Sequence, residues 1–227
     1  MILTLFEKRK EAEGVYSFKF RAEEEFSWKP GQYMFYTLPN LNPDERGVTR
    51  YFTISSTPFE KNIMLTTRIS SNGSSFKKSL NKMQKEDTIE VAGPDGNFVI
   101  TSPNRSYIFI AGGIGITPFR SILLDLDYNK LPINVHLLYA NRDNNIVFKD
   151  EIESLTARNS NFKIQYFISP IRIDEIVLRS LNSELRSPNF FVSGPKLFVQ
   201  NYSDVLKNIG IEKDRIKLDF FPGYTSE

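Results

Sequence analysis

The spacing of hydrophobic and polar residues changes once along the chain, near residue 102. Before that point, short runs rich in β-branched and aromatic residues alternate with turn signals such as Pro30-Gly31 and Pro94-Asp95-Gly96. The runs are LTLFEKR, VYSFKF, QYMFYTL, YFTIS, IMLTTRI, TIEVAG and NFVI. They predict an antiparallel sheet or a small barrel. One segment differs, because Phe76, Leu80 and Met83 recur at helical spacing and predict a short helix among the strands.

After residue 102 the strand-like runs YIFIA, INVHLLYA, FKIQYFIS and FFVSG alternate with helical patterns. The helical patterns cover residues 118–127, 146–157, 173–182 and 196–208, and a last strand-like run, RIKLDFF, follows them. Strands that alternate with helices are typical of a parallel α/β sheet. The sequence therefore predicts two domains, residues 1–102 and 103–227, with the boundary at Ser102-Pro103-Asn104.

The stretch AGGIGITPF, residues 111–119, joins the first strand of the second half to its first helix. Three glycines make the turn, Thr117 is the expected N-cap, and Pro118 is the expected first helical residue. A strand, a glycine turn and a helix N-terminus together favour a bound diphosphate, because free N–H groups and the helix dipole attract negative charge. The alternative is that the glycines only allow a tight turn.

The G-x-G-x-x-G dinucleotide fingerprint is only partly present in this stretch. Its third glycine would fall at Pro118, and Asn141 and Arg142 follow the second strand in place of the expected acid. The glycine stretch alone therefore leaves both interpretations open.

Composition excludes several other classes of function. The 29 basic and 27 acidic residues are interspersed and leave a net charge of +2, so no nucleic-acid partner is expected. The chain has no cysteine, which excludes disulfides, a thiol nucleophile and a thiolate-bound cluster. The single histidine, His136, lies in an apolar run, so no metal site is expected. Without a signal-like N-terminus or a run of about 20 apolar residues, we expect a cytoplasmic protein with no membrane insertion.

Two motifs resemble those of the ferredoxin-NADP reductase family. RYFT, residues 50–53, resembles its Arg-x-aromatic-Ser/Thr flavin motif, and GGIGITP, residues 112–118, resembles its nicotinamide-nucleotide loop. PGQY, NGSSF, GPDGNF, VSGP and DFFPGY follow the family order, so the resemblance covers nearly the whole chain. It implies an antiparallel six-stranded Greek-key β-barrel that binds FAD, then a Rossmann-like parallel α/β nucleotide-binding domain that binds NAD(P). No iron-sulfur module is implied.

In the first half, the resemblance implies flavin contacts around Arg50 and the NGSSF loop. Arg50 would bind the flavin diphosphate, Phe52 would lie against the isoalloxazine ring, and the Thr53 hydroxyl would lie near flavin N5. The alternative role of Arg50 is a surface ion pair, that of Phe52 is an inward-facing strand residue, and that of Thr53 is a residue that favours a strand. The alternative for the NGSSF loop is a serine-capped helix. The implied flavin-binding residues are Arg50, Tyr51, Phe52, Thr53, Thr67, Arg68, Gly73, Ser74, Ser75 and Phe76.

In the second half, the resemblance implies contacts with the nicotinamide nucleotide. Thr117 would lie near the nicotinamide, and Arg142 is the candidate for a 2′-phosphate contact, although Asp143 beside it would repel that phosphate. NADPH is therefore only slightly preferred over NADH. The implied nucleotide-binding residues are Gly112, Gly113, Ile114, Gly115, Ile116, Thr117, Pro118, Asn141, Arg142, Ser193, Gly194 and Pro195.

The C-terminal segment adds further candidates. Many family members have glutamate where Asp219 is found, and either Phe221 or Tyr224 would shield the flavin; the alternative is an edge strand with packed aromatic residues. Thr53, Thr117, Asp219 and Tyr224 are the implied catalytic residues.

The expected function is that of a flavoprotein oxidoreductase that takes hydride from NAD(P)H onto N5 of FAD and passes electrons to a separate acceptor. Ferredoxin, flavodoxin, an oxygenase component and a small molecule are candidate acceptors. One alternative is a flavin-binding electron-transfer or regulatory subunit that is active only within a complex. The other is a nucleotide-binding module without flavin. The choice of FAD over FMN depends on diphosphate contacts from Arg50 and the NGSSF loop.

Overall fold

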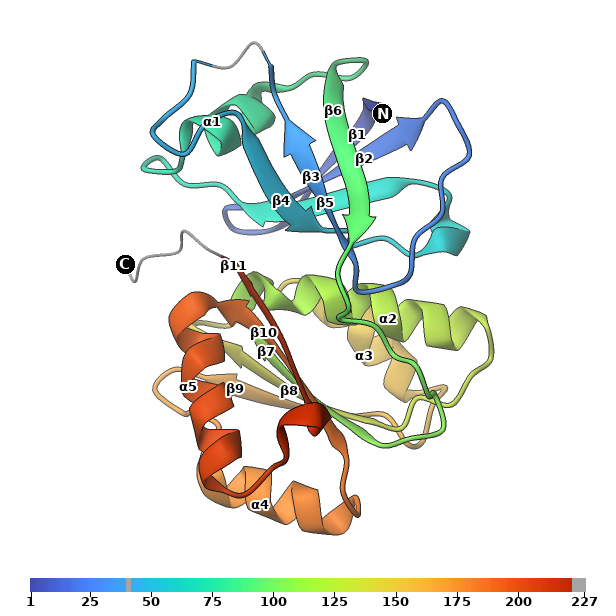
Figure 1. The fold of residues 1–227 in the computed structure, drawn as a ribbon, viewed down its shortest axis with the longest axis vertical. Helices are drawn as coiled ribbons and strands as arrows, with labels where there is room; N and C mark the ends of the chain where they lie inside the picture. Colours follow the sequence, from blue (N-terminus) through green and yellow to red (C-terminus); the bar gives the residue numbers. More distant parts are fainter. Residues whose placement is uncertain (40–41, 222–227) are drawn as a thin grey trace. The chain divides into compact units, whose positions relative to one another are not determined.

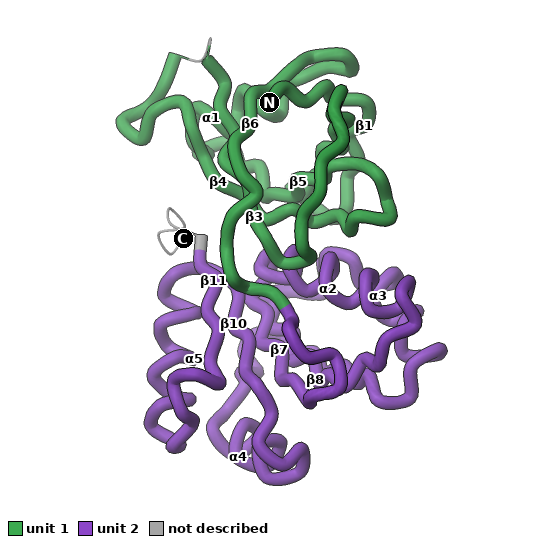
Figure 2. Tube along the Cα trace, turned by 45° about the vertical axis from the view of Figure 1, so that its right-hand side comes forward, with its two compact units in different colours: residues 1–99 green, residues 100–227 purple. Residues whose placement is uncertain are grey.

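The computed structural model describes residues 1–39 and 42–221. The chain divides into two compact units, residues 1–99 and 100–227 (Figure 2). Each unit has its own sheet and its own hydrophobic core.

Six antiparallel strands form the sheet of the first unit. They are β1 (Ile2–Ala12), β2 (Val15–Ala22), β3 (Tyr33–Thr37), β4 (Thr49–Thr53), β5 (Ile63–Arg68) and β6 (Thr88–Asp95). Their order in the sheet is β4-β3-β6-β1-β2-β5. An isolated antiparallel bridge between Ile54 and Leu65 links the chain just after β4 to β5, the strand at the opposite edge. The sheet therefore curls back on itself, in agreement with the antiparallel first half predicted from the sequence.

Helix α1 (Ser75–Lys82) contributes to the core of this unit. The side chains of Phe76 and Leu80 are fully buried, and the Phe76 ring lies 5.8 Å from that of Phe52 on β4. Ser74 is the N-cap of the helix, because its hydroxyl accepts a hydrogen bond from the backbone N–H of Lys77. The short helix predicted from the periodicity is confirmed.

The predicted strand over NFVI, residues 97–100, is wrong. The chain leaves β6 at Asp95, and Gly96 has a φ of +102°, which turns the backbone out of the extended conformation. Phe98 is nevertheless 4 % exposed. The apolar residues of this segment are explained by burial in an irregular connection.

Five parallel strands form the sheet of the second unit: β7 (Tyr107–Gly112), β8 (Val135–Asn141), β9 (Lys163–Ile168), β10 (Asn189–Pro195) and β11 (Ile216–Phe221). Their order is β11-β10-β7-β8-β9. The connecting helices are α2 (Ile116–Tyr128), α3 (Lys149–Thr156), α4 (Glu175–Glu184) and α5 (Lys196–Asn208). All four helical patterns predicted from the sequence are confirmed, with shifts of a few residues at their ends.

Helices cover both faces of this parallel sheet (Figure 1). The centre strand β7 is buried along its whole length. On one face, Phe109 of β7 stacks on Phe119 of α2, with ring centroids 4.5 Å apart. On the other face, Ile108 and Ile110 belong to a core cluster that includes residues of α4 and α5. A strand that is buried on both faces explains the uninterrupted apolar run in its sequence.

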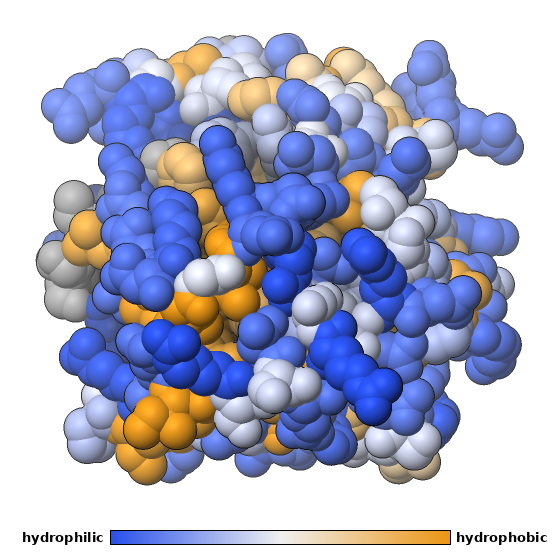
Figure 3. All heavy atoms as spheres, turned by 60° about the horizontal axis from the view of Figure 1, so that its bottom comes forward, coloured by the Kyte–Doolittle hydropathy of each residue, from blue (hydrophilic) through white to orange (hydrophobic). Residues whose placement is uncertain are grey.

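Some apolar side chains of the second unit remain on its surface. Ile171, Ile176, Leu197, Leu218 and Phe220 are 42–77 % exposed. In a space-filling view, apolar atoms form patches between charged side chains on one face of the molecule (Figure 3). No helix of the described segments is long and apolar enough to cross a membrane.

Candidate functional site

The order of the parallel strands defines a candidate binding edge in the second unit. The chain runs from β7 to β8 and β9 on one side, and then adds β10 and β11 on the other side of β7. The direction of strand addition therefore reverses between β7 and β10. In open α/β sheets, ligands bind outside the carboxyl ends of the strands at such a switch point. The glycine stretch follows β7 and Ser193-Gly194-Pro195 ends β10, so two predicted segments flank this point.

The glycines at this edge differ in what their bare backbone allows. A Cβ added to Gly115 would lie 2.2 Å from the carbonyl oxygen of Ser193, so Gly115 permits close packing of the turn against β10. A Cβ on Gly112 would meet the ring of Phe198 at 2.9 Å. Gly113 has a φ of +53° and no atom within 4 Å of an added Cβ. Only Gly113 of these three therefore offers open space for the approach of a ligand.

The prediction that Thr117 caps the following helix is wrong. A 3-10 turn over Gly113–Gly115 leads directly into α2, which begins at Ile116 with Gly115 as its N-cap. Thr117 is thus inside the first turn and is 2 % exposed. The glycines start the helix earlier than the Thr-Pro pair indicated, because they allow a 3-10 turn to continue into the helix.

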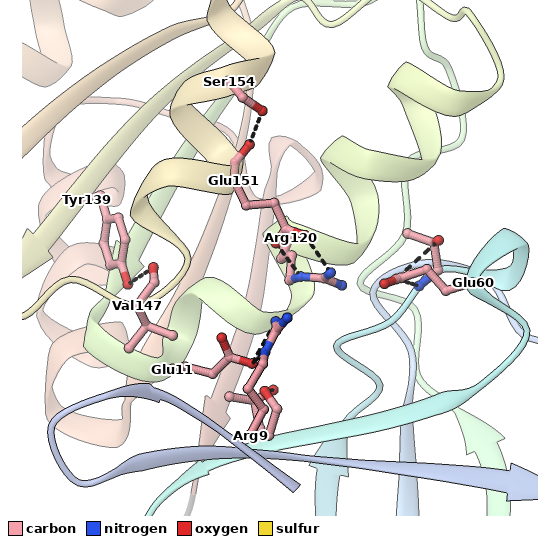
Figure 4. A network of polar contacts seen from close by, with 11 residues as sticks. Arg9, Glu11, Glu60, Arg120, Tyr139, Val147, Glu151 and Ser154 are labelled. Carbon is pink, nitrogen blue, oxygen red and sulfur yellow. Dashed lines mark hydrogen bonds and ion pairs between the residues drawn. The ribbon is translucent and has the colours of Figure 1, made fainter. Parts of the chain in front are cut away.

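Two side chains that the sequence did not single out make polar contacts in the second unit (Figure 4). The hydroxyl of Tyr139 on β8 lies 3.1 Å from the carbonyl oxygen of Gly113 and 3.2 Å from that of Val147. The guanidinium of Arg120 on α2 donates two hydrogen bonds, of 2.6 and 2.7 Å, to the carboxylate of Glu151 on α3. Tyr139 therefore holds the glycine turn against the loop that follows β8. An apolar strand context hid this role from sequence reasoning.

Ser193 and Asp219 form a polar pair at the same edge. They are register partners on β10 and β11, and the Ser193 hydroxyl donates a 3.0 Å hydrogen bond to the Asp219 carboxylate. Ser193 is fully buried. Desolvation raises the pKa of Asp219 to about 6, and the hydrogen bond from Ser193 opposes that rise. The Asp219 carboxyl therefore holds a proton more tightly than an ordinary aspartate does.

Asn141 and Arg142 lie at the carboxyl end of β8. Asn141 is the last residue of the strand, and its side-chain nitrogen is buried with no hydrogen-bond partner among the described residues. Arg142 and Asp143 are exposed just beyond it. The position of Arg142 at the binding edge is compatible with a contact to a phosphate group.

In the first unit, the pleat of β4 separates the residues of the RYFT motif. Arg50 and Phe52 are paired with Tyr36 and Met34 of β3. Phe52 is 9 % exposed and belongs to the core, so it fills the inward-facing role that was the alternative to a flavin contact. Tyr51 is half-buried, and its ring lies 5.4 Å from that of Tyr33. Alternation along the strand gives Tyr51 and Thr53 a common face opposite to Arg50 and Phe52.

The guanidinium of Arg50 makes several polar contacts. Its Nη1 donates to the backbone carbonyls of Arg46, Gly47 and Thr49 at 2.7–2.9 Å, and its Nη2 donates to the Asp44 carboxylate at 2.7 Å. The guanidinium lies 5.7 Å from the centre of the Phe76 ring. Its Nε is buried and has no hydrogen-bond partner within the described part of the chain.

Asp44 joins Arg50 to the NGSSF segment. The Asp44 carboxylate accepts a 2.9 Å hydrogen bond from the backbone N–H of Ser75, and the Ser75 hydroxyl accepts one of 2.9 Å from the Asp44 N–H. Two predicted diphosphate-binding segments, far apart in the sequence, therefore meet at one carboxylate. A guanidinium and a helix N-terminus that converge on a carboxylate form the donor set expected for an anion.

The remaining predicted flavin residues have varied surroundings. A Cβ on Gly73 would lie 3.0 Å from the carbonyl oxygen of Ser70, which indicates that this glycine serves a tight turn. Thr53 and Thr67 are almost fully buried, whereas Arg68 is exposed. Within the described residues, no group of three or more His, Asp or Glu side chains is arranged to hold a metal ion.

The C-terminal candidates are only partly described. Phe221 is the last residue of β11, where it pairs with Pro195 at the binding edge. Tyr224 lies outside the described residues.

Comparison with protein families matches two descriptions in succession. Residues 3–100 match the oxidoreductase FAD-binding domain, and residues 109–204 match the oxidoreductase NAD-binding domain. The chain is 26 % identical over 229 residues to a flavohemoprotein of Burkholderia sp. (strain TH2), covering 94 % of this chain and 57 % of that protein. It is 25 % identical over 215 residues to the ferredoxin reductase component of 3-ketosteroid-9-alpha-monooxygenase of Rhodococcus rhodochrous, covering 91 % of this chain and 60 % of that protein.

Solved structures share the fold. The ferredoxin-NADP+ reductase of Plasmodium falciparum superposes with a TM-score of 0.81 at 18 % identity, covering 97 % of this chain and 95 % of that chain. The FAD/NAD-binding domain of nitric oxide dioxygenase from Vibrio cholerae O1 biovar El Tor gives 0.77 at 20 % identity, covering 97 % and 98 %. The chain spans less than two thirds of the length of the curated relatives described above.

Proposed function

Because this chain belongs to the ferredoxin-NADP reductase family of oxidoreductases, with an FAD-binding domain before an NAD-binding domain, we propose that it oxidises NAD(P)H with a bound FAD and delivers the electrons to a separate acceptor. The observation that carries the proposal is that each unit has its own anion-binding arrangement. One consists of Arg50 and the N-terminus of α1, and the other is the open Gly113 turn at the switch point.

In the first unit, Arg50 and the first turn of α1 would hold the FAD diphosphate. Their donors already converge on one carboxylate. FAD, when bound, supplies N5 as the hydride acceptor and carries the electrons to the next acceptor. The Thr53 hydroxyl would orient that part of the ring by a hydrogen bond.

In the second unit, the glycine turn and the N-terminus of α2 would hold the coenzyme diphosphate, with the backbone of Gly113 nearest to it. Ser193 and Asp219 would lie on the nicotinamide side. Their hydrogen bond fixes the Ser193 hydroxyl, so that it is oriented before the coenzyme arrives. Thr117, in the first turn of α2, would contribute packing near the nicotinamide.

The exposed guanidinium of Arg142 supports a slight preference for NADPH, because it can bind a 2′-phosphate. In the variant Arg142→Ala, we expect KM for NADPH to rise by about tenfold, the effect of one lost charge-assisted contact, while KM for NADH changes little. Equal effects on both coenzymes would remove Arg142 from 2′-phosphate recognition. A steady-state comparison of the two coenzymes measures this.

The acceptor is proposed to be a protein such as a ferredoxin, a flavodoxin or an oxygenase component, or a small molecule. Two observations support a protein acceptor: the reductase component of an oxygenase among the relatives, and exposed apolar side chains on the second unit. A cytoplasmic location also stays a prediction. The alternative of a subunit active only in a complex predicts coenzyme binding without turnover of a small acceptor.

The direct test of the enzymatic proposal uses the protein loaded with FAD. We expect it to oxidise NADPH or NADH with ferricyanide as the electron acceptor. The variant Thr53→Val keeps the shape of the side chain and removes the hydroxyl, so we expect kcat to fall by about tenfold with KM unchanged. A loaded wild-type protein that leaves both coenzymes unoxidised would favour the subunit alternative.

A further inference from the structure

We propose that Asp44 is an internal competitor of the FAD diphosphate: its carboxylate binds the same donors, on Arg50 and α1, and must leave them when FAD binds. This inference rests on the proposed function, because it concerns the FAD site named there. Asp44 would oppose the binding of FAD and so lower the affinity of the site for FAD.

The contacts of Asp44 define the competition. One carboxylate oxygen accepts from Nη2 of Arg50 at 2.7 Å and from the backbone N–H of Arg46 at 3.1 Å. The other accepts from the backbone N–H of Ser75, the first residue of α1, at 2.9 Å. A carboxylate that bridges a guanidinium and a helix N-terminus satisfies the donors that a phosphate group would need.

Exposure shows which group an incoming anion meets first. The Arg50 side chain is 8 % exposed, whereas that of Asp44 is 28 % exposed. Nη1 of Arg50 is already shared among three backbone carbonyls, and the Nε is buried. A diphosphate therefore approaches the negative Asp44 carboxylate before it reaches the guanidinium. The two negative groups repel each other at close range.

Asp44 is charged under ordinary conditions. Desolvation pushes its pKa up, but hydrogen bonds from Ser75 and Arg46 and the charge of Arg50 outweigh that effect and hold the pKa below its usual value. The repulsion is consequently present at neutral pH.

The position of Asp44 in a loop is consistent with its leaving the site. Residues 42–48 lie in the connection between β3 and β4, and hydrogen bonds with Ser75 join Asp44 to α1. The carbonyl of Thr49, the first residue of β4, also accepts a hydrogen bond from Nη1 of Arg50, and Thr49 lies outside this connection. The guanidinium thus keeps a contact with β4 after the carboxylate has left.

The test compares FAD affinity of the full chain with Asp44→Asn, Asp44→Ala and the control Asp87→Asn. Asp87 accepts a 2.7 Å hydrogen bond from the backbone N–H of Gln84 in an exposed turn, so its variant removes one negative charge away from Arg50. Flavin fluorescence quenching gives the dissociation constant, and thermal unfolding without FAD reports the integrity of each variant.

We expect both Asp44 variants to bind FAD about tenfold more tightly than the wild type, the change expected when one close like charge is removed from an anion site, with Asp87→Asn unchanged. Binding by the Asp44 variants that is equal to or weaker than that of the wild type would overturn the inference and make Asp44 a positioning residue, while the proposed function stands. If neither the wild type nor any variant binds FAD, this result contradicts both the inference and the proposed function. An Asp44→Ala variant that unfolds leaves the decision to Asp44→Asn, which keeps one acceptor oxygen.

Discussion

At the scale of single residues, Asp219 links protonation to stability. Its pKa is raised from 3.8 to about 6, first by desolvation, so the folded protein binds a proton more tightly than the unfolded chain does. The stabilising contribution is present below the unfolded pKa and is lost as the pH rises from about 4 to about 6. Ser193 limits this loss through its hydrogen bond.

We therefore expect the variant Asp219→Asn, which does not titrate, to gain stability relative to the wild type as the pH rises. The difference in the free energy of unfolding should grow by about 2.4 kcal/mol between pH 4 and pH 7. Urea unfolding at several pH values measures it. A difference that does not vary with pH would show that Asp219 has an ordinary pKa.

Substitution by alanine is expected to cost much more stability at Gly115 than at Gly113. Gly115→Ala places a Cβ 2.2 Å from the Ser193 carbonyl oxygen, so we expect a loss of stability of about 3 kcal/mol or more. Gly113→Ala meets no atom within 4 Å, and its φ of +53° costs about 1 kcal/mol.

The two glycine variants also differ in coenzyme binding. Because the new Cβ of Gly113→Ala enters the open space of the turn, we expect weaker NAD(P)H binding in a protein that remains folded. Calorimetric unfolding and coenzyme titration separate the two effects. Similar destabilisation by both variants would contradict the different roles assigned to the two glycines.

At the scale of elements, Tyr139 ties the glycine turn to the loop after β8. We expect Tyr139→Phe to lose about 1 kcal/mol of stability and to raise KM for NAD(P)H several-fold with little change in kcat. The matched control is Tyr202→Phe, because the Tyr202 hydroxyl donates to the carbonyl of Ile173 on the other side of the sheet. If both variants shift KM equally, the effect is one of general stability.

Sequence patterns predicted those helices and strands well whose type follows from the spacing of apolar residues. They predicted less well the features that depend on contacts in the folded chain. The antiparallel half, the parallel half and the helix over α5 follow from alternation and helical spacing. The start of α2 does not, because Thr117 and Pro118 carry stronger helix-start signals than the glycines that actually precede the helix. The link between Asp44 and Ser75 also escaped, since the pairing of residues distant in sequence depends on the folded chain.

At the scale of the whole molecule, each unit carries one half of the proposed chemistry. Residues 3–100 match an FAD-binding domain and residues 109–204 an NAD-binding domain, and the anion-binding arrangements of the two units fall within these ranges. Binding of FAD to the folded chain should raise its stability by about 2.7 kcal/mol at a free concentration 100 times the dissociation constant. Because a bound FAD would carry the redox chemistry, few side chains would need to act as acids or bases.

The measurement that tests the central claim most directly is an anaerobic titration of the FAD-loaded protein with NADPH and then NADH, followed by its visible spectrum. The account predicts that the yellow flavin absorbance bleaches rapidly with at least one of the two coenzymes. A flavin that stays oxidised in the presence of both would contradict the proposed hydride transfer.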